Sequence, residues 1–174
     1  MKTNSNNSLE NKRKIEMAID QQRLHARMLC EAMGWKFYPV LKKHNFIGYC
    51  LTPDGIIPIE LKVRSQNSDK FPSILIEQKM VNSLTKRAKH LGYRRCFYAE
   101  FYRGDNSFLY FDISSAPFEW VREECNVNTL DGSKKTKKTV SFLDKSFATR
   151  VELNPPAQPE IQVGERFPTT YKLF

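Results

Sequence analysis

The chain has 174 residues, and its 28 Lys and Arg against 19 Asp and Glu give a formal net charge of +9. This length suits one domain of ordinary size, and no apolar run approaches the ~20 residues of a membrane span. The polar start, MKTNSNNSLENKRK, lacks the apolar segment of a secretory signal, so we expect a cytoplasmic protein. The basic excess favours a polyanionic partner, nucleic acid first and a membrane surface second.

Four cysteines are scattered through the chain without a Cys-x-x-Cys pair or a histidine at zinc spacing. Three of them lie in apolar surroundings and are interpreted as small core side chains in a reducing compartment. The four are Cys30, Cys50, Cys96 and Cys125.

The first elements are a polar lead-in and a long helix. We expect residues 1–8 to be flexible, because they are rich in Asn and Ser. Residues 9–33 contain no Gly or Pro and carry apolar side chains at helical spacing, and Gly34 supplies a C-cap. This pattern predicts an amphipathic helix, and residues 35–41 (WKFYPVL) predict a strand after it.

Residues 44–64, HNFIGYCLTPDGIIPIELKVR, predict a β-hairpin that turns at Pro-Asp-Gly, residues 53–55. In its second strand, alternation places Glu60 and Lys62 together on one face, opposite an apolar face. A carboxylate beside a lysine in a cleft can hold a divalent cation and a phosphate oxygen, while the lysine orients or deprotonates water. The same pair would equally suit a structural ion pair on an open sheet face.

The middle of the chain predicts a second helix over residues 75–91, which Gly92 closes. Strands at 94–102 and 107–113 follow, joined by a Gly-Asp-Asn turn. The order α-β-β-β-α-β-β therefore predicts an α/β (α+β) fold with helices on one or both faces of a mixed sheet.

The last third carries weaker signals. Residues 118–123 predict a short helix, and residues 131–138 a basic loop that leads into a strand at 139–142. Four prolines beyond Leu153 indicate an extended tail over 154–174. We therefore expect a single domain over 9–153, between the lead-in and the tail.

This order of elements, with Glu-x-Lys on the third strand, resembles the PD-(D/E)XK nuclease superfamily between about Leu9 and Ile113. Residues 71–102, FPSILIEQKMVNSLTKRAKHLGYRRCFYAEFY, are similar to the second helix and following strand of RecU-type Holliday-junction resolvases. The resemblance implies a restriction-endonuclease-like core and an endonuclease that uses Mg²⁺ or Mn²⁺ on branched or duplex DNA. A glutamine of that helix faces the site in the family, and Gln78 would occupy its place.

The family motif also has an aspartate ahead of Glu-x-Lys. Asp54 lies in the turn, ~20 Å along the strand from Glu60, and cannot readily share a cation with it. A two-residue loop would place Asn45 opposite Lys62 and ~7 Å from Glu60, so Asn45 would occupy the aspartate position. A three-residue turn would leave no ligand there.

Asparagine offers a neutral oxygen where the family has a carboxylate, which weakens Mg²⁺ binding. Three explanations stay open: a weakened or inactive nuclease, an inactive variant, or a site whose missing acid comes from the first helix. The helical candidates are Asp20 and Glu16.

The resemblance assigns metal binding to Glu60, Asn45 and Asp20, water positioning to Lys62, and a supporting role to Gln78. A homodimer would suit cleavage of two strands, and a DNA-binding protein would associate with the nucleoid. The alternatives are a DNA-binding module without catalysis and an interaction protein with an incidental Glu-x-Lys pair. DNA phosphates would contact Lys42, Lys43, Arg64, Lys134, Lys135, Lys137 and Lys138.

Overall fold

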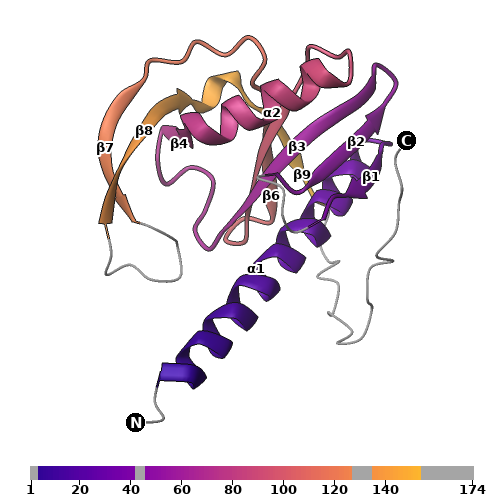
Figure 1. Cartoon of the computed structure of the whole chain (residues 1–174). Coiled ribbons are helices and arrows are strands. Elements are labelled where there is room, and N and C mark those ends of the chain that lie inside the picture. Colours follow the sequence, from indigo (N-terminus) through magenta and orange to yellow (C-terminus); the bar gives the residue numbers. More distant parts are fainter. Residues whose placement is uncertain (1–3, 42–45, 127–134, 154–174) are drawn as a thin grey trace.

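The computed structural model describes residues 4–41, 46–126 and 135–153, with side chains from Glu10 onward (Figure 1). Within them lie two α-helices, nine strands and one short 3-10 helix, η1. Their bounds are α1 Asn4–Ala32, β1 Lys36–Pro39, β2 Gly48–Thr52, β3 Gly55–Arg64, β4 Ser73–Glu77, α2 Gln78–His90, β5 Phe97–Tyr102, β6 Ser107–Asp112, β7 Val121–Asn126, β8 Lys135–Asp144, η1 Lys145–Phe147 and β9 Thr149–Glu152.

The strands form a six-stranded sheet in the order β1-β2-β3-β5-β6-β9 and a three-stranded sheet in the order β4-β8-β7. Only the β3–β5 pair is parallel among the strands described. This is the mixed sheet with flanking helices expected for a restriction-endonuclease-like core. The expected α-β-β-β-α-β-β order is confirmed, with β4 added before α2.

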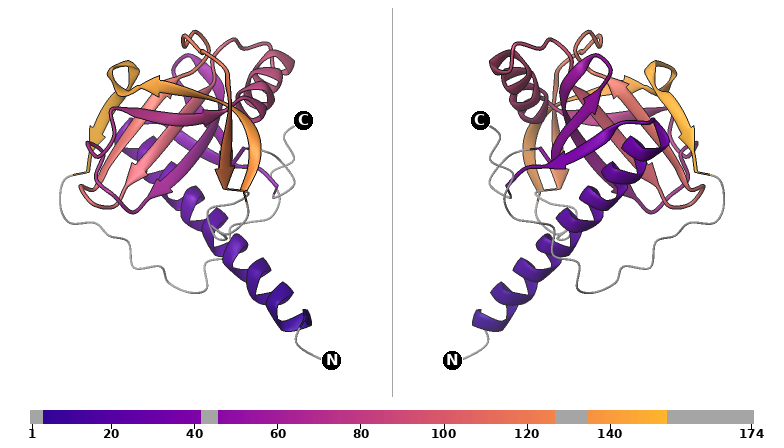
Figure 2. Two further views of the ribbon diagram at one scale, coloured as in Figure 1. Left: turned by 90° about the vertical axis from the view of Figure 1, so that its left-hand side faces the viewer. Right: turned by 90° about the vertical axis from the view of Figure 1, so that its right-hand side faces the viewer.

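Alternation along the central strands divides the core into two layers. On one face of the large sheet, Leu61 of β3 packs in a cluster with Leu29 of α1. On the other face, Tyr98 of β5 belongs to a cluster that includes Leu84 of α2 and Ile74 of β4. The helix α1 therefore covers one face, whereas α2 and the small sheet cover the other (Figures 1 and 2).

The first helix is longer than the part of it that packs. It begins at Asn4, inside the lead-in that the sequence predicted to be flexible, and its N-terminal half extends beyond the sheets (Figure 2). The buried residues Ala26, Leu29 and Cys30 have helical spacing. Gly34 follows the helix with a φ of 70°, in the left-handed conformation that glycine adopts most easily.

The predicted hairpin is confirmed, including its register. Thr52 pairs with Gly55, so Pro53 and Asp54 form a two-residue loop, and Gly48 pairs with Ile59 further along. Gly55 has a φ of +115°, and a Cβ there would lie 2.5 Å from the ring of Tyr93. Glycine is therefore required at this turn for its backbone conformation and for space.

Three predictions about local structure were wrong. Residues 73–77, in part predicted helical, form β4, because Ile74 and Ile76 point into the core while the strand pairs with β8. The helix predicted at 118–123 is absent, because residues 118–120 have no regular structure and residues 121–123 begin β7. The predicted basic loop is a strand from Lys135 on, because β8 pairs with β7 and sets Lys138 opposite Glu123.

Candidate functional site

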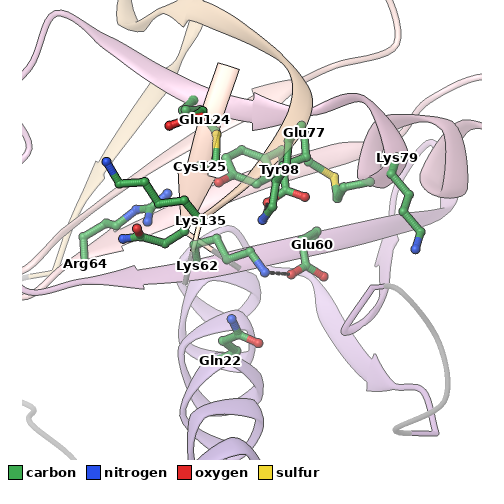
Figure 3. A pocket seen from close by; sticks show the side chains of 14 residues that line it. Gln22, Glu60, Lys62, Arg64, Glu77, Lys79, Tyr98, Glu124, Cys125 and Lys135 are labelled. Atoms are coloured by element: carbon green, nitrogen blue, oxygen red, sulfur yellow. Dashed lines mark hydrogen bonds and ion pairs between the residues drawn. The ribbon is translucent and has the colours of Figure 1, made fainter. Parts of the chain in front are cut away.

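A cleft of about 780 Å³ opens beside the face of β3 that carries Glu60 and Lys62 (Figure 3). Five cationic side chains and three carboxylates line it, so the cleft has the charge balance of a surface that binds anions. The lining residues are Gln22 of α1, Glu60, Lys62 and Arg64 of β3, Leu75 and Glu77 of β4, Lys79 and Met80 of α2, Tyr98 of β5, Glu124, Cys125 and Asn126 of β7, and Lys135 and Lys138 of β8.

The predicted pairing of Glu60 with Lys62 is present in this cleft. The Nζ of Lys62 donates to Oε1 of Glu60 over 2.5 Å. Glu60 is only 4% exposed, and this burial raises the pKa of its carboxyl group, although Lys62 and the backbone N–H of Ile47 act in the opposite direction. The Lys62 side chain keeps 41% of its surface exposed and connects the buried carboxylate with the cleft.

A second buried carboxylate, which sequence reasoning missed, lies next to this pair. Glu100 of β5 is the partner of Lys62 in the parallel β3–β5 register and is 2% exposed. Its Oε1 accepts hydrogen bonds from Arg64 Nε (3.0 Å) and Nη2 (2.5 Å) and from the Tyr98 hydroxyl (2.9 Å), and its Oε2 accepts one from Tyr102. Two tyrosines at positions ±2 in an otherwise apolar strand were the sequence signal for this network.

The hydrogen bonds to Glu100 fix the position of Arg64 at the cleft. Burial and the nearby Glu100 carboxylate raise the pKa of Tyr98, which keeps this hydroxyl protonated and able to donate. Arg64 was predicted to contact phosphate, and it does line the cleft. Its guanidinium is already bonded to Glu100, however, so it would present only its remaining N–H groups to a ligand.

A third carboxylate enters the cleft at the junction of β4 and α2. Glu77, the last residue of β4, accepts a hydrogen bond over 2.7 Å from Nζ of Lys138 on β8, the central strand of the small sheet. The predicted Gln78 is the first residue of α2, between Glu77 and Lys79, but it is not one of the residues that line the cleft. The local helix geometry therefore presents the neighbours of Gln78 to the cleft.

The first helix contributes a neutral side chain to the cleft. Gln22 lines it, whereas the predicted Asp20 is half exposed and lies 3.7 Å from Arg23, and neither Asp20 nor Glu16 is a lining residue. Of the predicted phosphate contacts on β8, Lys135 and Lys138 line the cleft and Lys137 does not. The remaining predicted residues, Asn45, Lys42, Lys43 and Lys134, lie outside the described residues.

The oxygen donors of the cleft suit a hard divalent cation. Glu60, Glu77 and Gln22 offer carboxylate and amide oxygens, and Mg²⁺ commonly uses one or two carboxylates and completes its shell with water and phosphate. In the part of the chain that is described, no group of three His, Cys, Asp or Glu side chains could hold a metal by itself. A cation in this cleft would therefore need water or phosphate oxygens to complete its ligands.

Fold and cleft together define an α/β domain with a buried acid and a lysine at the floor of a cationic cleft. No protein-family model matches the chain, and no curated protein is matched. Among solved structures, it is similar to Hjc, a Holliday junction resolvase from the hyperthermophilic archaeon Archaeoglobus fulgidus. The TM-score is 0.44 at 12% sequence identity, over 71% of this chain and 88% of that chain. In the described residues, neither helix has the length and apolarity that crossing a membrane requires.

Proposed function

We propose that this protein is a metal-dependent DNA endonuclease of the PD-(D/E)XK type, which hydrolyses phosphodiester bonds. The observation that supports this most is the Glu60–Lys62 pair, because the carboxylate is buried at the floor of a cationic cleft and the ammonium reaches the cleft from the same strand. A structural pair on an open sheet face would have both charges in water. Burying the charge of Glu60 costs free energy, and ionisable groups perturbed in this way are concentrated at functional sites.

In this proposal Glu60 is the principal ligand of Mg²⁺ or Mn²⁺, and Gln22 replaces Asp20 as the contribution of the first helix. The cation, when bound, would polarise the scissile phosphate and lower the pKa of a water molecule. Lys62 would hold the attacking water and stabilise the charge that develops at phosphorus. Asn45 keeps the metal-binding role that the family resemblance implies, whereas Gln78 is given no role because it does not line the cleft.

The DNA backbone would lie along the cationic lining of the cleft. Arg64, Lys79, Lys135 and Lys138 all line it, and an interface dominated by phosphate contacts loses affinity steeply as salt increases. Branched DNA such as a four-way junction is the substrate that the RecU-type resemblance favours. Paired cleavage of such a junction would need a symmetric homodimer, which sedimentation in the presence of junction DNA would detect.

A second candidate function is a DNA-binding module with the same fold and no catalysis. Two observations favour it. The carboxylates of Glu60 and Glu77 are each bonded to a lysine, Lys62 and Lys138, and the helix side chain in the cleft is the neutral Gln22. This leaves little uncompensated negative charge for a cation.

A cleavage assay separates the two functions. The substrates are linear duplex, single-stranded and four-way junction DNA with Mg²⁺ or Mn²⁺, and the proteins are wild type, Glu60→Gln, Lys62→Met and the control Glu31→Gln. Glu31 is an exposed residue of α1 that does not line the cleft. The proposal expects cleavage by wild type and the control, and background levels with the other two. DNA binding by all four proteins without cleavage by any would favour the binding module.

A further inference from the structure

The cleft has the dimensions of one nucleic-acid strand. Side chains approach it from two sides, with Glu60 and Lys62 of β3 below and Glu124 and Cys125 of β7 above in Figure 3. Its volume of about 780 Å³ falls within the ~300–1,000 Å³ of sites that enclose one drug-sized molecule. A few nucleotides of a single strand are of that size class, whereas paired bases with two backbones are far larger.

Positive charges line the cleft from β3 on one side and from β8, the strand that pairs with β7, on the other. Lys62 and Arg64 belong to β3, and Lys135 and Lys138 belong to β8. A phosphodiester backbone that runs between the two strands would have cations on either side of it. A duplex resting on the rim would reach only the outer ends of these side chains.

A large exposed aromatic side chain lies next to the cleft. Phe142 of β8 is 56% exposed. It is the cross-strand partner of Leu75 on β4, so the two side chains share one face of the small sheet, and Leu75 lines the cleft. Proteins that bind single strands use exposed aromatic rings beside a cationic groove, because an unpaired base can stack on such a ring.

We propose that the cleft binds a single-stranded segment of DNA, with its phosphates between β3 and β8 and one base stacked on Phe142. The substrate would then be DNA with an unpaired or splayed strand, such as a flap, a fork or an opened junction, and not an uninterrupted duplex. This inference rests on the proposed function only for the hydrolysis of the bound strand at Glu60 and Lys62. The binding preference itself needs no metal.

The experiment measures fluorescence anisotropy in EDTA with a labelled oligothymidylate and a blunt hairpin duplex of equal length. Wild type is expected to bind the single strand at least tenfold more tightly. Phe142→Ala should weaken single-strand binding by about 5- to 150-fold, which corresponds to the ~1–3 kcal/mol of one base–aromatic stack, and leave duplex binding unchanged. The matched control is Phe147→Ala, because Phe147 in η1 is equally exposed, at 57%, but is not the cross-strand partner of a residue that lines the cleft.

Single substitutions of two lysines test where the DNA backbone lies. Lys135→Ala should reduce the slope of log affinity against log salt by about 0.7, the value for one lost phosphate contact on a single strand. Lys89→Ala, at an exposed position of α2 away from the cleft, should leave the slope unchanged. Equal slopes for Lys135→Ala and wild type would place the backbone elsewhere and overturn the proposed path.

Equal or tighter binding of the duplex by wild type would overturn the inference, as would equal losses from Phe142→Ala and Phe147→Ala. Cleavage with Mn²⁺ is measured separately on the same two DNAs. Cleavage without a preference for the single strand would contradict this inference and leave the proposed function standing. A single-strand preference with no cleavage of any DNA would support the inference and contradict the proposed function.

Discussion

The Lys62 ammonium lies 2.5 Å from the carboxylate of Glu60, yet the two side chains have very different environments. The Glu60 side chain is 6% exposed and that of Lys62 is 41% exposed. Burial therefore outweighs the attraction of the lysine, and the pKa of Glu60 is raised. A buried carboxyl group with a raised pKa in a cleft is more common at functional sites than in structural ion pairs.

The first prediction is that Glu60→Gln stabilises the protein at pH 8. Because the folded-state pKa of Glu60 is raised, the folded protein binds more protons than the unfolded chain between the two pKa values, and stability falls as pH rises through this window. The glutamine variant has no ionisable group at this position, so its stability does not fall in this pH window. We expect its free energy of unfolding to exceed that of wild type at pH 8, with a smaller difference at pH 4.

Urea unfolding at pH 4, 6 and 8 measures this difference. The control is Glu124→Gln, an exposed position on the far side of the same cleft, which should change the stability by less than about 0.5 kcal/mol at every pH. A Glu60→Gln variant that is less stable than wild type at pH 8 would show that the Glu60–Lys62 pair is a structural ion pair.

The second prediction concerns metal and proton competing for one carboxylate. Because the pKa of Glu60 is raised by its burial, its carboxylate takes up a proton at higher pH than an exposed glutamate does, and a cation that binds there must displace the proton. Mn²⁺ affinity should therefore fall as pH is lowered. Calorimetry at pH 5.5 in two buffers of different ionisation enthalpy should detect proton release, and Glu60→Gln should abolish it. Equal apparent enthalpies in the two buffers would place the metal elsewhere.

The elements that local sequence determines could be predicted. The Pro-Asp-Gly turn predicted the hairpin, and the two-residue loop, one of two registers that the sequence left open, is the one observed. Alternation placed Glu60 and Lys62 on one face of β3. The first helix was predicted from its periodicity, and its end from Gly34. Each of these signals lies within a few residues of the feature it predicts.

The elements that depend on distant pairing could not be predicted. Residues 75–77 were predicted to begin the second helix, but β8 comes beside residues 73–77 from more than sixty positions further along the chain and pairs with them as a strand. The cleft has the same origin, because Gln22, Glu77 and Lys135 come from three separate elements that only the fold brings together. The partner of Arg64 was equally hidden, because Glu100 lies on a strand that is parallel to β3 and distant in sequence.

The third prediction is a loss of stability in acid that depends on Asp105. Burial alone would favour the neutral acid, but hydrogen bonds from Ser68, Ser107 and Arg150 lower the pKa of Asp105 to about 2. A lowered folded-state pKa contributes stability above the unfolded value near 3.8, and this stability is lost as pH falls from about 4 to about 2.

Asp105→Asn should therefore lower the free energy of unfolding by about 1–3 kcal/mol at pH 7 and by much less at pH 2. Denaturant unfolding across this pH range measures the effect. Asp69→Asn serves as the control, because Asp69 is exposed in the loop next to Ser68. A pH-independent difference between wild type and Asp105→Asn would mean that packing, and not the charge, is what the loop requires.

The last prediction is that the buried Glu100 network matters more to stability than any exposed ion pair. Glu100→Gln removes the charge that Arg64 faces at 2.5 Å and leaves a guanidinium with only 28% side-chain exposure without a carboxylate partner. Removing one partner of a buried pair costs ~3–5 kcal/mol, and the residual exposure of Arg64 puts the expected loss near the lower end, about 3 kcal/mol.

Two further variants show whether the lost charge of Glu100 causes the loss of stability. Asp54→Asn breaks the ion pair with Arg95, in which both side chains are more than 40% exposed, and should cost less than about 1 kcal/mol. The double variant Glu100→Gln/Arg64→Met removes both charges and should be more stable than Glu100→Gln alone, because no uncompensated charge stays buried. Equal losses for the single and the double variant would instead assign the effect to the hydroxyl groups of Tyr98 and Tyr102, which donate to the same carboxylate.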